Sequence, residues 1–157
     1  MNKDFIVFGQ PLIEQEEIDE VVDSLKNSWI GTGPKVSRFE DAFLAYKGAS
    51  CAAAVGSCTA GLFLALRALD IGPGDEVITS PHTFFATVGA IARVGAKPVL
   101  VDIEPTSFNI DPVKIEAAFT SKTKAVMPVH LFGQSSEMKP IVEMCQKRGV
   151  AVIEDAA

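Results

Sequence analysis

A short segment of small and hydroxyl-bearing residues, Gly56-Ser57-Cys58-Thr59-Ala60-Gly61, is suited to anion binding. It follows an apolar run and precedes an apolar helical pattern, so its backbone N–H groups would point outward from a helix N-terminus. A phosphate would fit there, with the hydroxyl groups of Ser57 and Thr59 as further donors. Capping of the helix by one of these hydroxyls explains them equally well. The segment lacks the pattern of a P-loop and of a dinucleotide site, which argues against both nucleotide classes.

Two adjacent acids, Glu154 and Asp155, follow the last apolar run of the sequence. A carboxylate at the end of a strand is well placed to pair with a cationic ring nitrogen or a metal ion. Neighbouring strand residues point to opposite faces, so only one of the two readily serves the same ligand. Asp155 lies nearer the open end of the strand, and capping of the following turn is the structural alternative.

Two phenylalanines, Phe84 and Phe85, follow another apolar run. One ring would be able to stack on a flat cofactor, although core packing is the simpler account when the two residues are taken alone. A structural role is also the simpler interpretation of His82 and His130. Cys58 and Cys145 are expected to be buried small residues rather than nucleophiles. For the cysteines, nothing nearby in the sequence supplies an activating base.

Alternating strands and helices would position these segments. Apolar residues recur every three or four positions from Glu14 to Trp29, which predicts an amphipathic helix, and a second helix is expected to end at Gly48. Further helices are expected after Thr59, over 84–94 and 113–119, and up to Arg148. Strands are predicted at 51–55, 76–80, 98–103, 124–129 and 150–154.

This alternation predicts an α/β fold with three layers, in which helices cover both faces of a mainly parallel sheet. Ligands of such sheets bind beyond the carboxyl ends of the strands. The three chemistry-bearing segments all follow predicted strands, so we expect them to meet at that edge.

Charge and residue composition argue against several classes of function. The 157 residues are 48% hydrophobic and 22% charged, and the net charge of −6 argues against nucleic acid as a partner. Three cysteines and two histidines do not show zinc-ligand spacing, so no metal site is expected, and a reduced, cytoplasmic location is the simple interpretation. No apolar run approaches the ~20 residues of a membrane helix. Met1 to Phe8 is too short for the core of a signal peptide.

Six segments in order resemble the DegT/DnrJ/EryC1/StrS family of sugar aminotransferases, which use pyridoxal 5′-phosphate (PLP). The resemblance runs from about Phe8 to the last residue. The segments are WIGTGPKV at 29–36, GSCTAGL at 56–62, GPGDEVI at 72–78, PVLVDI at 98–103, VHLFGQ at 129–134 and VIEDAA at 152–157.

The resemblance implies the large domain of a fold-type I PLP enzyme, incomplete at its C-terminus, with active sites at a homodimer interface. Residues 1–48 would form an N-terminal helical segment, and 49–157 would form the N-terminal part of the PLP-binding domain. It further implies that Thr59 and the backbone of Cys58 hold the cofactor phosphate. Phe84 would lie over the pyridine ring and Asp155 would face its nitrogen. Thr32 would face the sugar nucleotide.

The activity implied by the resemblance is transfer of an amino group from an amino acid, glutamate first, to a nucleotide-linked keto-sugar. The family's Schiff-base lysine is expected beyond residue 157, so no catalytic residue is assigned in this chain, and the chain alone is expected to be inactive. A sugar dehydratase of the same family, with histidine in place of that lysine, is one alternative. A non-catalytic module that keeps the cofactor cleft is another. The pathway stays open, polysaccharide biosynthesis included.

Overall fold

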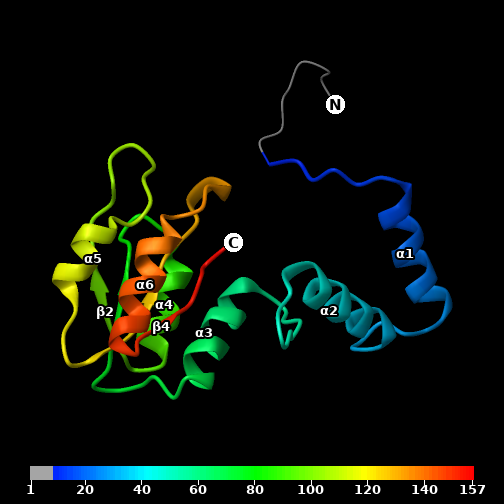
Figure 1. Cartoon of the computed structure of the whole chain (residues 1–157). Helices are drawn as coiled ribbons and strands as arrows, with labels where there is room; N and C mark the ends of the chain where they lie inside the picture. Colours follow the sequence, from blue (N-terminus) through cyan, green and yellow to red (C-terminus); the bar gives the residue numbers. More distant parts are fainter. Residues whose placement is uncertain (1–8) are drawn as a thin grey trace. The chain divides into compact units, whose positions relative to one another are not determined.

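The computed structural model describes residues 9–157 (Figure 1). The interpretation of Met1 to Phe8 as too short for a signal peptide lies outside the described residues. The chain divides into two compact units, Met1–Ala54 and Val55–Ala157. None of the helices within residues 9–157 combines the length and the apolar character needed to cross a membrane.

The described part of the first unit contains two helices, α1 at Gln15–Lys26 and α2 at Pro34–Lys47. The backbone N–H of Glu14 donates to the Glu17 carboxylate over 2.7 Å, which satisfies one free donor at the start of α1. Gly48 ends α2 in the left-handed conformation, at φ 62°, as its position after the last apolar residue predicts. Neither helix buries a residue, so the apolar stripe of each stays exposed.

The second unit carries a parallel sheet with the strand order β2-β1-β3-β4. This arrangement confirms the predicted α/β class. Along the chain the elements are α3 (Cys58–Ala68), β1 (Glu76–Thr79), α4 (Phe85–Arg93), β2 (Lys97–Leu100), α5 (Pro112–Ala118), β3 (Thr123–Met127), the 3₁₀ turn η1 (Leu131–Gly133), α6 (Met138–Arg148) and β4 (Ala151–Val152).

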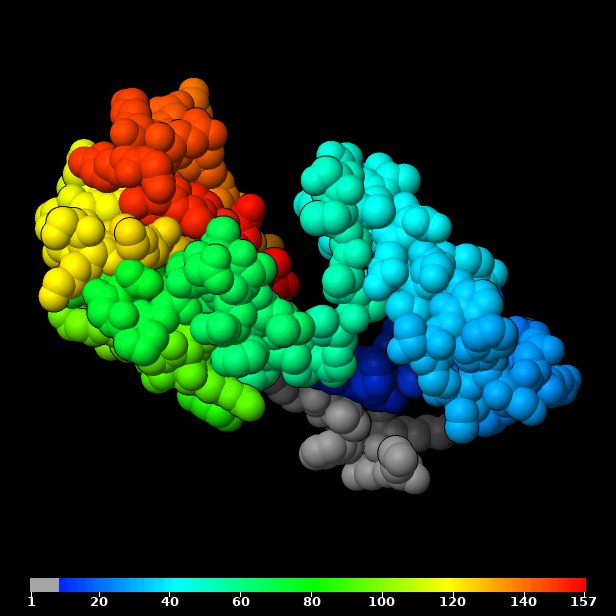
Figure 2. Space-filling view, turned by 90° about the horizontal axis from the view of Figure 1, so that it is seen from below, coloured from blue at the N-terminus to red at the C-terminus, as the bar shows by residue number. Residues whose placement is uncertain are grey.

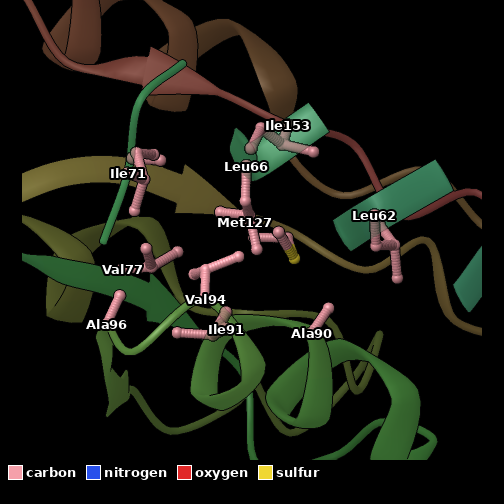
Figure 3. Packing of buried hydrophobic residues seen from close by; sticks show 11 residues of the cluster. Leu62, Leu66, Ile71, Val77, Ala90, Ile91, Val94, Ala96, Met127 and Ile153 are labelled. Carbon is pink, nitrogen blue, oxygen red and sulfur yellow. The ribbon is translucent and has the colours of Figure 1, made fainter. Parts of the chain in front are cut away.

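Two apolar cores lie on opposite faces of the sheet. Val77 of β1 packs with α3 and α4, whereas the next residue, Ile78, packs with α5 and α6. This alternation follows from the two-residue period of a strand and gives the predicted three layers. Figure 3 shows the first core, in which Leu66 of α3 and Met127 of β3 point toward one another.

One predicted strand is wrong. Residues 51–55 are not in a strand, and most of them are exposed. A strand requires a hydrogen-bonded neighbour, and no segment within residues 9–157 pairs with this one. The small side chains of Ala52, Ala53 and Ala54 also bury little apolar surface.

The other predicted elements are present with shifted ends. The side chain of Asp111 caps α5 by accepting the N–H of Val113 over 2.9 Å, and Pro112 takes the first helical position. Gly149 ends α6 with a left-handed φ of 65°. Pro140 lies in the first turn of α6, where its missing N–H costs no helical hydrogen bond.

Candidate functional site

A cavity of about 410 Å³ opens within the second unit, where the ends of strands meet the start of α3. Its walls come from α3, from the loops after β1 and β3, and from the end of the chain. Figure 2 shows the C-terminal residues, in red, beside the green residues of α3. The lining includes four residues implied by the family resemblance, namely Cys58, Thr59, Phe84 and Asp155.

The start of α3 has its first N–H groups available. Ser57 is the N-cap residue, and its hydroxyl accepts the N–H of Ala60 over 3.2 Å. The capping alternative is therefore correct for Ser57, whereas Thr59 is exposed and lines the cavity. Within the described residues, the N–H groups of Cys58 and Thr59 have no hydrogen-bond acceptor. This end of the helix suits an anion, since the dipole and two free donors meet there.

Asp155 is held by its backbone beside the end of β3. Its N–H donates to the carbonyl of Pro128 over 2.9 Å, and its own carbonyl accepts the N–H of His130 over 2.9 Å. These bonds extend the parallel pairing of β3 with β4 by an isolated bridge between Val129 and Asp155. The position of the acid thus depends on the sheet rather than on a free loop.

The side chain of Asp155 is surrounded by donors. The hydroxyl of Thr87 donates to Oδ2 over 2.7 Å, and Oδ1 accepts the thiol of Cys58 at 3.7 Å and the N–H of Ala157 at 3.3 Å. Asp155 is only 5% exposed. The carboxylate is therefore the acceptor of all three contacts, and it lines the cavity where a cationic ring nitrogen would be able to pair with it.

The Cys58 thiol is not an activated nucleophile. Burial of the thiol raises its pKa, and so do the nearby charge of Asp155 and the hydrogen bond to it. The residue as a whole is exposed, so the expectation of a buried cysteine is wrong for Cys58. It is right for Cys145, which is fully buried in α6. At neutral pH the Cys58 thiol therefore keeps its proton and donates to Asp155.

The two phenylalanines after β1 are exposed. Phe84 is 67% exposed and Phe85 is 74% exposed, with ring centroids 4.2 Å apart. Core packing is thus the wrong account of both residues. The apolar face of α4 is built from Ala86, Ala90 and Ile91 instead, which leaves the ring of Phe84 at the cavity.

His130 lines the cavity and pairs with Glu154. The N–H of Ser136 donates to Nδ1 of His130 over 3.1 Å, so the other ring nitrogen carries the proton of the neutral imidazole. That nitrogen, Nε2, lies 2.8 Å from the Glu154 carboxylate and donates to it. His130 therefore joins two loops, in keeping with the structural role expected for it.

Thr87 is the site residue that the sequence interpretation missed. It is fully buried in α4 and contacts Asp155 across 68 positions of sequence. The one available signal is a second threonine four positions earlier, Thr83, which lies just before α4 and whose hydroxyl is 2.7 Å from that of Thr87. Thr32 lies in the other unit, where it is exposed and its carbonyl accepts the indole N–H of Trp29 over 3.0 Å. Its contact with a sugar nucleotide stays a prediction.

The fold of this chain is that of solved aminotransferases, among them an aminotransferase from Psychrobacter cryohalolentis with a TM-score of 0.87 and 38% identity over 92% of this chain and 37% of that one. The chain belongs to the DegT/DnrJ/EryC1/StrS aminotransferase family, whose model matches residues 11–157.

Individual relatives match almost the whole chain. The spore coat polysaccharide biosynthesis protein SpsC of Bacillus subtilis (strain 168) is 55% identical over 153 residues, which cover 98% of this chain and 39% of SpsC. A Streptococcus pneumoniae structure in its PLP form has a TM-score of 0.90 and 36% identity, and the match covers 97% of this chain and 43% of that one. NtdA from Bacillus subtilis, solved with bound cofactor PMP, has a TM-score of 0.85 and 36% identity over 92% of this chain and 34% of NtdA. The chain spans about two fifths of the length of the curated relatives it matches.

Proposed function

We propose that the protein is a PLP-dependent aminotransferase that moves an amino group from glutamate to a keto-sugar attached to a nucleoside diphosphate. One observation carries this proposal: the start of α3 and the carboxylate of Asp155 line the same cavity. PLP has an anionic phosphate at one end and a basic ring nitrogen at the other. The N-terminus of α3 suits the anionic phosphate, and the carboxylate of Asp155 suits the protonated ring nitrogen.

The residues at the start of α3 fit a phosphate. Two backbone N–H groups, of Cys58 and Thr59, are free of acceptors within the described residues, and the Thr59 hydroxyl adds a third donor. The described residues that line the cavity include no lysine or arginine. Attraction of the phosphate would therefore come from the helix end and these neutral donors.

Asp155 and Phe84 fit the ring. PLP, when bound, supplies an electron sink for a carbon atom that loses a proton beside the amino nitrogen. The role of Asp155 would be to hold a proton on the facing ring nitrogen, since an ionised carboxylate favours the cationic form of a neighbour. Phe84 would cover one face of the ring, and its exposed side chain at the cavity supports this role.

The remaining parts of the proposal concern the whole protein. The name of SpsC and the family support a sugar acceptor and a place in polysaccharide biosynthesis. Thr32 would contact the sugar nucleotide, and the lysine that reacts with PLP would lie beyond residue 157. A homodimer would complete the site. The exposed apolar stripes of α1 and α2 support that association, because an apolar helix face is normally covered.

The experiment uses protein expressed from the complete coding sequence. It is incubated with PLP, glutamate and a panel of nucleotide-linked keto-sugars, and mass spectrometry follows both products. An amino sugar and 2-oxoglutarate should form in equal amounts, and Asp155→Ala should lose most of this activity while keeping part of its PLP binding. Loss of water from the sugar without gain of nitrogen would overturn the aminotransferase assignment in favour of a dehydratase. Equal activity of Asp155→Ala would overturn the role of Asp155.

A further inference from the structure

We propose that Thr87 is a positioning residue, held by Thr83, that orients the Asp155 carboxylate toward the ring nitrogen of the coenzyme. The inference rests on the proposed function. It concerns a residue that does not line the cavity and would act only through Asp155.

The direction of the hydrogen bonds follows from counting protons. Oγ1 of Thr87 lies 2.7 Å from Oδ2 of Asp155 and 2.7 Å from Oγ1 of Thr83. An ionised carboxylate only accepts, so the single hydroxyl proton of Thr87 goes to Asp155. Thr83 must then donate its own proton to Thr87. The chain of hydroxyls is therefore directed, from Thr83 through Thr87 to the carboxylate.

This chain fixes the rotation of the carboxylate. Oδ1 accepts two donors, the Cys58 thiol and the Ala157 N–H, at 3.7 and 3.3 Å. Oδ2 accepts the Thr87 hydroxyl at 2.7 Å, which is the shortest of the three contacts. Each carboxylate oxygen has about two acceptor positions, so Oδ2 keeps one for a further donor. Without Thr87, the two long contacts to Oδ1 would be left to hold the side chain.

Stability alone does not distinguish a positioning role of Thr87 from a purely structural one. Thr87 is fully buried, so removal of its hydroxyl is expected to lower stability whether or not it positions Asp155. Thr79 is a matched control because it is also fully buried, and its hydroxyl donates to the carbonyl of Met127 over 2.8 Å. It makes no hydrogen bond to Asp155 within the described residues.

The test compares two ligands that differ only at the ring nitrogen. Pyridoxamine 5′-phosphate is used because its amine does not react with a lysine, and its partner is the analogue in which C–H replaces the ring nitrogen. The two dissociation constants are measured by fluorescence titration on protein from the complete coding sequence. Their ratio reports the contact between Asp155 and the nitrogen, and shape and phosphate contacts cancel.

We expect the unaltered protein to prefer the nitrogen-containing ligand, and Asp155→Ala to lose that preference. Thr87→Val should reduce it roughly 10-fold, about the effect of one hydrogen bond to a charged group. Thr87→Ser should restore it, Thr83→Val should reduce it less than Thr87→Val, and Thr79→Val should leave it unchanged. In the Asp155→Ala background, Thr87→Val should have no further effect on the ratio.

The outcomes separate the two proposals. If the unaltered protein shows no preference, or Asp155→Ala keeps it, the assignment of Asp155 to the ring nitrogen fails, and the inference fails with it. If Asp155→Ala loses the preference but Thr87→Val keeps it, only the role of Thr87 is overturned. Should Thr87→Val not fold, Thr83→Val decides, because an unchanged ratio in that variant refutes the directed chain.

Discussion

Leu66 is expected to determine how firmly α3 is held against the sheet. It is fully buried, and it packs with Met127 and Val77 in the core that α3 shares with α4. The start of α3 is also the proposed phosphate site. Truncation of Leu66 to alanine should therefore weaken both the fold and the binding of a phosphate-bearing ligand.

The magnitude follows from the burial. Leu66→Ala removes three carbon groups, worth roughly 0.8 kcal/mol each in transfer free energy, and leaves a cavity that adds to the loss. We expect a decrease of about 3 kcal/mol in the free energy of unfolding, a large fraction of the ~5–15 kcal/mol of an ordinary protein. Leu64 is the matched control on the same helix. It is 50% exposed, so Leu64→Ala should cost well under half as much.

Urea unfolding followed by circular dichroism measures both variants. With a slope of roughly 1–3 kcal/mol per molar urea, the midpoint for Leu66→Ala should fall by about 1–3 M. The dissociation constant for pyridoxamine 5′-phosphate is measured without urea. Equal midpoints for Leu66→Ala and Leu64→Ala would refute the packing of α3 on the sheet.

Three further predictions concern a cap, a turn and a thiol. Asp111→Ala should lower the free energy of unfolding by about 1 kcal/mol in thermal or urea unfolding, because the N–H of Val113 loses its cap; an unchanged midpoint would contradict that role. Hydrogen bonds from the backbone N–H groups of Ser107 and Thr106 lower the pKa of Glu104 from its ordinary value of 4.5 to about 2. Between these pH values the unfolded chain binds more protons than the folded one, so the contribution of Glu104 to stability is complete above pH 4.5 and is lost as the pH falls toward 2. The free energy of unfolding of Glu104→Gln should therefore fall less over this pH range than that of the unaltered protein. The same pH dependence in both proteins would refute this role of Glu104. At pH 7.5 Cys58 should react with iodoacetamide more slowly than the exposed Cys51, and replacement of Asp155 by alanine should make Cys58 react faster. Peptide mass spectrometry measures both rates. A Cys58 that reacts faster than Cys51 in the unaltered protein would contradict the raised thiol pKa.

The local elements of this protein are determined by its sequence. Asp111 and Pro112 start a helix, and Gly48 and Gly149 end two others, because caps act through hydrogen bonds and backbone conformations within a few residues. The alternation of apolar runs with helical patterns likewise predicts a parallel sheet and the edge where ligands bind. These signals need no knowledge of distant contacts.

Contacts between distant segments were decided by the tertiary structure. The run at 51–55 is short and apolar, like a buried strand, but a strand depends on a neighbour, and none pairs with it in residues 9–157. Phe84 looks like a core residue, but the small side chains of α4 fill that core and leave its ring exposed. The hydrogen bond from Thr87 to Asp155 joins residues 68 positions apart, which meet only because α4 packs on the sheet and β4 pairs with β3. Residue types and short spacings are encoded locally, whereas the surroundings of a buried carboxylate depend on the order of the strands and on which helices cover them.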